Sequence, residues 1–321
     1  MGRNQSEVRV TRISLPRKFL RQPPASFAAL ASLAMIINVP TATAQLAQHK
    51  SQIISGIDEA VRSLDTVPRL KKLSPQKKKE LVEFVTGNTL FVVAHEMGHG
   101  LINEMHIPVV GREEDAADSF AIVTALNMGS GFSERVLIEA AKGWLLFSKR
   151  DKKLGNALTF YGEHGLDLQR AYNVVCFMVG SNPEKYRALA METKLPKARQ
   201  ASCVYEWKNT AWSWEELLQK HLRSAEEPKV AVKIEYEESE KLAIQGRILR
   251  HMGLLEAFAA QSADRYTWPN PLTIEARSCG MANARWRQRV LTLCYELANE
   301  FIEVFLGYSS KLPRNRKRGK T

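Results

Sequence analysis

Two short segments of this chain combine residue types that can bind and use a metal ion. The first reads His95-Glu96-Met97-Gly98-His99, and the second, a little further on, contains Glu114 and Asp118. If the first segment is helical, its two histidines lie one turn apart on the same face. Two neutral imidazoles at that spacing can bind one zinc ion, and Glu96 between them can act as a general base.

The acidic segment is the nearest source of a third ligand. We expect a carboxylate oxygen of Glu114 to bind the zinc ion, and Asp118, one turn further on, to accept a hydrogen bond from the outer nitrogen of a ligand histidine. Glu113 is expected to point elsewhere, because neighbouring residues on a helix diverge by about 100°. The alternative is an acidic first turn that complements the helix dipole, which does not account for Asp118.

Two histidines, one glutamate and an open fourth position are typical of catalytic zinc rather than structural zinc. The ion would acidify its water and polarise a carbonyl, while Glu96 would pass the water's proton to the leaving amine. The sequence therefore predicts a zinc-dependent metallopeptidase. Two other functions stay open: a catalytically silent zinc-binding protein that acts as a binding or inhibitory partner, and a structural protein that carries the pentad by accident.

His164 is the one further candidate for the site. It lies close in sequence to Tyr161 and Arg170, and a His, Tyr or Arg beside the zinc can stabilise the oxyanion of a tetrahedral intermediate. The equally weighted alternative is that His164 caps or packs at the start of a helix.

The elements that must hold these residues are predicted to be helices. Ser74-Pro75 is typical of a helix start, Gly87-Asn88 is expected to interrupt that helix, and residues 90–105 then carry the histidines. Gly98 is expected to leave the helix face open for a substrate. Residues 113–128 have the apolar spacing of the next, amphipathic helix.

The rest of the chain predicts an α+β fold that is mostly helical with a small sheet. Residues 230–237, 272–276 and 290–294 are expected to be strands, the last of them pairing back across Gly280, and residues 241–263 one long helix. No linker divides this part of the chain, so we expect one domain over residues 45–310.

The N-terminal residues 1–44 match a secretory signal peptide. A basic stretch ends near Arg21, an apolar segment follows over 25–39, and Ala42-Thr43-Ala44 provides an Ala-x-Ala site. We expect cleavage after Ala44; the alternative, an uncleaved membrane anchor, has an apolar stretch that is short for a bilayer. The mature protein is therefore expected to be exported, periplasmic or secreted, without a transmembrane span.

The net charge of +12 does not predict nucleic-acid binding. Residues 1–44 carry six basic residues and one acidic residue, and residues 311–321 carry six basic residues and no acidic one, so the part between is close to neutral. The C-terminal run is expected to be a disordered, solvated tail. The expected partner is a peptide or protein substrate, and the sequence does not indicate an oligomeric state.

Four cysteines suggest disulfides in an exported protein. They allow three pairings, of which we expect the local ones, Cys176 with Cys203 and Cys279 with Cys294. The alternatives are buried free thiols or a zinc site, and a zinc site is disfavoured because no Cys-x-x-Cys spacing occurs.

The pentad followed by Glu-x-x-x-Asp resembles the gluzincin metallopeptidases, of which thermolysin is the type. More closely, the chain resembles a bacterial family known as metallopeptidases from sequence alone. This resemblance implies a zincin-like, zinc-dependent peptidase domain with paired cysteines, and it supplies no substrate. The stretches that carry it are residues 95–102, 111–118, 163–176 and 279–284, followed by Cys294-Tyr295-Glu296-Leu297.

Overall fold

The computed structural model describes residues 55–307. The expected signal peptide (1–44) and basic tail (311–321) lie outside the described residues. Within the described range, no helix is long and apolar enough to cross a membrane. Residues 55–63 are helical, and the elements that follow are η1 (Leu64–Thr66), α2 (Pro68–Lys71), α3 (Pro75–Glu104), α4 (Glu113–Asn127), α5 (Gly131–Lys153), α6 (Asp167–Ser181), α7 (Arg187–Glu192), α8 (Lys197–Gln219), β1 (Val232–Tyr236), α9 (Ala243–His251), α10 (Leu254–Arg265), β2 (Leu272–Arg277), β3 (Ala284–Arg287), β4 (Val290–Cys294) and α11 (Tyr295–Phe305).

Helix α3 is the central element, and it is continuous where an interruption was predicted. Ser74 caps its start by accepting a hydrogen bond from the Lys77 amide, and Pro75 occupies the first turn. Asn88 does not break the helix, because its side-chain amide donates to the carbonyls of Phe84 (2.9 Å) and of Glu139 on α5 (3.0 Å). The prediction of a break at Gly87-Asn88 was therefore wrong: the polar residue bonds to a neighbouring helix.

The predicted strands are confirmed, but the pairing of the last one was wrong. The sheet has the order β1-β2-β4-β3, in which β1, β2 and β4 are parallel and β3 is antiparallel to β4. β4 therefore pairs with β2 in parallel rather than folding back across Gly280. The strand β3 was not predicted, because its hairpin turn is made by Gln288 and Arg289 at φ values of 51° and 64° without the usual Asn-Gly signal.

The predicted long helix over 241–263 is in fact two helices. Gly253 adopts a left-handed φ of 58° between α9 and α10, a conformation that ends the first helix and redirects the chain. The apolar periodicity continues across this turn because both helices bury residues in the same core, among them Ile248, Leu249, Leu254 and Leu255.

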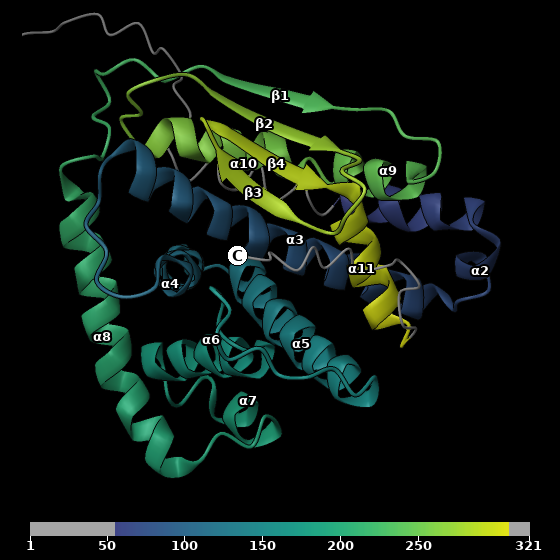
Figure 1. The fold of residues 1–321 in the computed structure, drawn as a ribbon, viewed down its shortest axis with the longest axis horizontal. Coiled ribbons are helices and arrows are strands. Elements are labelled where there is room, and N and C mark those ends of the chain that lie inside the picture. Colours follow the sequence, from purple (N-terminus) through teal and green to yellow (C-terminus); the bar gives the residue numbers. More distant parts are fainter. Residues whose placement is uncertain (1–54, 308–321) are drawn as a thin grey trace, which may run out of the picture. The chain divides into compact units, whose positions relative to one another are not determined.

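Helix α3 lies between the sheet on one side and helices α4, α5 and α6 on the other (Figure 1). On one side it contacts β3, β4 and α11, and on the other it contacts α4 and α5. One core fills the space between α3, the sheet and helices α9 to α11; a second core lies among α5, α6 and α8. The described part is thus mostly helical with a small mixed sheet, as expected.

Both expected cysteine pairs are at disulfide distance. The sulfur atoms of Cys176 and Cys203 lie 2.01 Å apart and join α6 to α8. Those of Cys279 and Cys294 lie 2.06 Å apart and join the loop after β2 to the end of β4. The loop after β2 continues directly into β3, so the second disulfide ties the start of this hairpin to the sheet.

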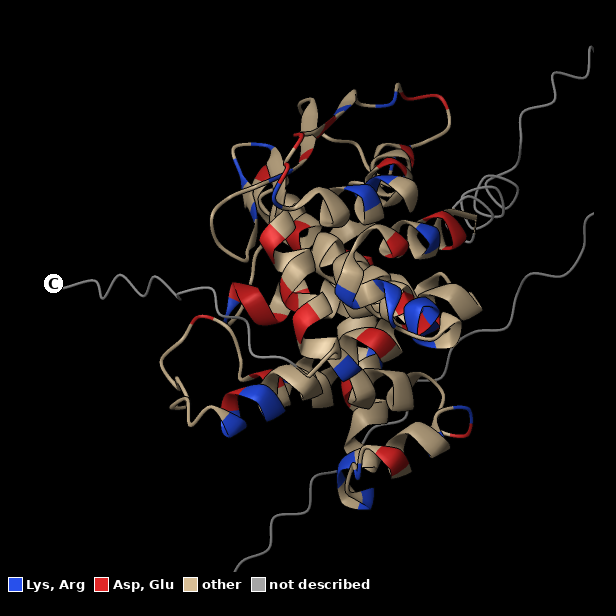
Figure 2. Cartoon of the chain, turned by 90° about the vertical axis from the view of Figure 1, so that its right-hand side faces the viewer, with Lys and Arg blue, Asp and Glu red and all other residues tan. Residues whose placement is uncertain are grey.

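Acidic and basic residues are interspersed along the helices of the face shown in Figure 2. Short-range ion pairs between such residues include Arg62 with Glu59 and Lys77 with Glu80. This mixed pattern agrees with the nearly neutral charge of the chain between its two basic ends.

Candidate metal centre

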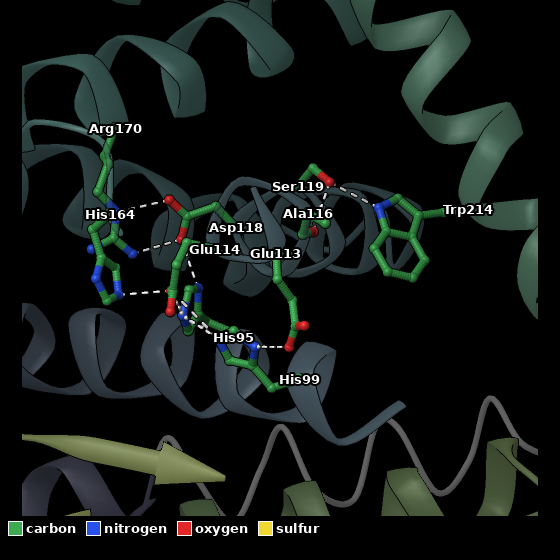
Figure 3. Close-up of polar contacts among 10 residues, drawn as sticks. All are labelled: His95, His99, Glu113, Glu114, Ala116, Asp118, Ser119, His164, Arg170 and Trp214. Carbon is green, nitrogen blue, oxygen red and sulfur yellow. Dashed lines mark hydrogen bonds and ion pairs between the residues drawn. The ribbon is translucent and has the colours of Figure 1, made fainter. Parts of the chain in front are cut away.

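The site forms where α4 crosses the end of α3. An added Cβ at Gly98 would lie 3.0 Å from Cα of Ala117 and 3.3 Å from the Phe120 ring, so the glycine lets the two helices approach closely. This corrects the expectation that Gly98 keeps the helix face open for a substrate. The close crossing brings the first turns of α4 over the two histidines of α3 (Figure 3).

Each histidine of α3 is held from behind by a carboxylate of α4. Nδ1 of His95 donates to Oδ1 of Asp118 at 2.8 Å, and Nδ1 of His99 donates to Oε1 of Glu113 at 2.7 Å. Glu113 therefore reaches the site, contrary to our expectation. The two ring nitrogens of His99 point in different directions, so the diverging side chains of Glu113 and Glu114 can both contact this ring.

The remaining imidazole nitrogens converge on one oxygen of Glu114. Its Oε2 atom lies 3.1 Å from Nε2 of His95, 3.4 Å from Nε2 of His99 and 2.7 Å from Nε2 of His164. The Nε2 atoms of His95 and His99 are 3.1 Å apart. The structure thus brings together the five residues that we expected to be metal ligands (His95, His99, Glu114), to support a ligand (Asp118) or to stabilise the oxyanion (His164).

His95, His99, Glu114 and His164 form a donor cluster that has the chemistry of a metal site. Donor atoms of His95, Glu114 and His164 all lie within 4.8 Å of one another. Oε2 of Glu114 is buried, yet no described residue gives it a hydrogen bond of good geometry. A buried carboxylate oxygen surrounded by imidazole nitrogens is a site that a cation satisfies. The residues present therefore fit a bound metal ion.

Asp118 is itself anchored by a buried arginine. Nε and Nη2 of Arg170 on α6 donate to the two oxygens of Asp118 at 2.7 and 2.6 Å, and the guanidinium lies 3.7 Å from the ring centroid of Trp144. Burial raises the pKa of Asp118, but the opposite effects of Arg170 and of the hydrogen bond from His95 are larger. Together they lower the pKa to about 2. Arg170 therefore supports the carboxylate that orients His95, and it is not free to stabilise an oxyanion.

Opposite charges also balance each other around the converging nitrogens. Burial lowers the pKa of His99, but Glu114 and Glu113 outweigh it and raise that pKa to about 9. Burial raises the pKa of Glu114, but its contacts with His164, His95 and His99 hold it well below its usual range. The cluster thus favours a carboxylate at Glu114.

Glu96 lies beside the cluster, buried between α3 and the sheet. Only 7% of it is exposed, and burial raises the pKa of its carboxyl, while the backbone amide of Trp286 on β3 acts in the opposite direction. It lines a cavity of about 760 Å³ that also contains the histidines. The other walls of this cavity come from α3, α5, the residues that lead into α4, the residues around His164 and the segment that includes β3. They include Asn103, Arg112, Trp144, Glu163, Asn283, Arg285 and Trp286.

Several supporting residues were not found by reasoning on the sequence. Trp214 on α8 donates to Oγ of Ser119 at 2.8 Å, and Ser119 donates to the carbonyl of Ala116 at 2.7 Å, which holds α4 in place (Figure 3). Nothing in the spacing of these residues indicates the contact. Tyr161, which we weighed beside His164, is almost fully exposed.

Comparison with known protein families gives one match. The model of a family described as "Putative metallopeptidase" matches residues 57–218, which is half of the chain and contains every residue of the donor cluster. No curated protein and no solved structure matches the chain.

Proposed function

Because the chain belongs to the family described as "Putative metallopeptidase", we propose that it is a zinc-dependent peptidase with Glu96 as its general base. One observation carries the proposal: imidazole nitrogens and a carboxylate oxygen converge on one point, and a buried glutamate lies beside them in the same cavity.

The residues that would hold the ion are His95, His99 and Glu114. Nitrogen and carboxylate oxygen donors in this ratio are those of catalytic zinc sites. A zinc ion bound there would polarise the peptide carbonyl and make the attacking water more acidic. Asp118 and Glu113 hold the Nδ1 proton of the two histidines, which directs both Nε2 atoms toward the ion; binding the ion would displace any proton from Nε2.

Glu96 would handle the protons of the reaction. Its carboxylate accepts a proton from the attacking water and delivers it to the nitrogen of the leaving amine. Glu96 is only 7% exposed, and a hydrogen bond from the backbone of Trp286 would help to hold its carboxylate in place. His164, whose Nε2 lies 2.7 Å from Oε2 of Glu114, would donate a hydrogen bond to the oxyanion that develops on the carbonyl oxygen.

The strand β3 offers a means to align a peptide. It is an outer strand of the sheet and forms one wall of the cavity that contains Glu96. An extended peptide can add to such an edge through main-chain hydrogen bonds, which bind many sequences alike. The proposed substrate is therefore an extended segment of a peptide or protein that is bound mainly through its main-chain hydrogen bonds.

The proposal also places the peptidase outside the cytoplasm. Two cysteine pairs at disulfide distance support an oxidising compartment, and the sequence of residues 1–44 supports export. N-terminal sequencing of the exported protein tests this part, and a mature chain that begins at Met1 would contradict it.

The mechanism is tested by Glu96→Gln, with Glu104→Gln on the same helix as the matched control. Peptide-library cleavage is measured with and without a chelator, together with the zinc content. We expect Glu96→Gln to keep its zinc and to lose about 10²–10⁴-fold in rate, and Glu104→Gln to match the parent. Equal cleavage by Glu96→Gln and the parent would refute the role of Glu96. Zinc without cleavage in the parent would identify a silent binding protein.

A further inference from the structure

His164 is held differently from the other two histidines of the donor cluster. His95 and His99 come from a central helix, each is hydrogen-bonded to a carboxylate through Nδ1, and their side chains are 5% and 16% exposed. The His164 side chain is 50% exposed, and no described residue is hydrogen-bonded to its Nδ1. It is therefore the one imidazole of the cluster that is free to leave it.

Its Nε2 atom nevertheless lies among the donor atoms of the cluster, within 4.8 Å of those of His95 and Glu114. It lies 2.7 Å from Oε2 of Glu114, the oxygen that the other two Nε2 atoms also approach, and its ring stacks on that of His95 with centroids 5.9 Å apart and planes at 22°. Tetrahedral zinc with bonds of about 2.0–2.1 Å holds its donors about 3.3 Å apart. Oε2 of Glu114 lies 2.7, 3.1 and 3.4 Å from the three Nε2 atoms, which is close to this spacing, so three imidazoles and one carboxylate are available as four ligands.

The segment that carries His164 has no anchor in either core. It connects the end of α5 at Lys153 to the start of α6 at Asp167, and none of residues 151–169 is buried. Its apolar side chains face solvent: Leu158, Phe160 and Tyr161 are 61%, 78% and 92% exposed. A segment with so few buried contacts can move without disrupting the helices at its ends.

We propose that His164 is a detachable metal ligand. It binds the ion through Nε2 while the cavity holds no peptide, and it withdraws when a peptide carbonyl enters. The inference rests on the proposed function, because a peptidase needs an open position that four protein ligands would close. The exchange replaces one neutral ligand by another and leaves the charge of the site unchanged. The withdrawn imidazole then stays close enough to donate to the oxyanion.

The first test counts imidazole ligands in the zinc-loaded full chain by X-ray absorption spectroscopy. We expect three in the parent, two in His164→Ala and three in Phe160→Ala, a control in the same segment. Chelator competition should show weakened zinc binding in His164→Ala and unchanged binding in the control. Two imidazoles in the parent would overturn the proposal. Complete loss of zinc from His164→Ala would also overturn it, because His164 would then be an indispensable ligand.

The second test follows the exchange with a dipeptide hydroxamate as the probe. On adding it, we expect the parent to fall from three imidazoles to two and His164→Ala to remain at two. Three imidazoles in the parent with the probe bound would show that His164 does not detach. A parent chain that holds less than about half an equivalent of zinc would refute the metal-dependent function itself, whereas an active parent with two imidazoles throughout would refute only the detachable ligand.

Discussion

Nδ1 of His95 donates a hydrogen bond across 2.8 Å to Oδ1 of Asp118, and this bond ties the central helix to α4 at the donor cluster. Arg170 of α6 grips the same carboxylate, and Trp144 of α5 covers the guanidinium. Four helices thus contribute to the chain of contacts that orients this imidazole. The orientation of His95 is therefore held by a buried carboxylate and a buried guanidinium.

Replacing Asp118 by Asn should weaken zinc binding about 10–100-fold, because the amide no longer holds the His95 tautomer as a carboxylate does. Glu113→Gln should have a smaller effect, since the Glu113 side chain is 47% exposed and that of Asp118 only 6%. Chelator competition on the folded variants gives both affinities. Equal losses would mean that burial of the supporting carboxylate does not matter.

Replacing Arg170 by Ala should destabilise the fold by about 3–5 kcal/mol, because it leaves the buried Asp118 carboxylate without its cation. Urea unfolding measures this loss. Arg170→Lys should recover only part of it, since an ammonium cannot make the two parallel hydrogen bonds or the flat contact with Trp144. Full recovery by lysine would show that only the charge is needed.

Glu296 should make stability depend on pH at a point remote from the donor cluster. Its carboxylate accepts hydrogen bonds from the amides of Cys279 and Gly280 and from the Ser278 hydroxyl. Burial raises the pKa of Glu296, but these donors outweigh it and hold the pKa below its ordinary value of 4.5. A lowered pKa in the folded state stabilises the protein above the ordinary value, and this stabilisation is lost as pH falls through the folded-state pKa.

We therefore expect Glu296→Gln to lower the free energy of unfolding by about 2 kcal/mol at pH 7, and the difference from the parent to shrink below pH 4.5. Urea unfolding at a series of pH values checks this. A difference that stays constant down to the acid limit would show that the carboxylate charge is not involved.

The two disulfides should differ in what their removal affects. Replacing either pair by serines should cost about 3 kcal/mol of stability. Loss of Cys279–Cys294 should also reduce kcat/KM for peptides, because the loop it holds leads into the cavity wall at Asn283 and Trp286. Loss of Cys176–Cys203 should leave kcat/KM unchanged in the folded fraction. The reverse pattern would contradict the placing of the β3 strand in the substrate site.

The sequence could nominate four of the residues that the structure brings together because they form two pairs with helical spacing. His95 and His99 are one helical turn apart, as are Glu114 and Asp118, so residue type and spacing were sufficient to nominate them. The strands at 232–236, 272–277 and 290–294 were likewise indicated by alternation and apolar runs.

What was missed depends on contacts between distant segments. Arg170 reaches Asp118 from 52 positions away and Trp214 reaches Ser119 from 95 positions away, and neither distance leaves a periodic signal. Asn88 was taken for a helix breaker because its partner on α5, the Glu139 carbonyl, is visible only in the folded structure. β3 was missed because its turn uses residues that rarely adopt positive φ.

One wall of the cavity is contributed by β3. In the sequence, more than half of the chain lies between β3 and the segment His95–His99. A polypeptide made from its N-terminus therefore contains the residues of the donor cluster early, whereas this wall of the cavity forms only when the last hairpin has docked. If the chain is the peptidase proposed above, it could cleave a peptide only after this hairpin has completed the cavity, late in its synthesis.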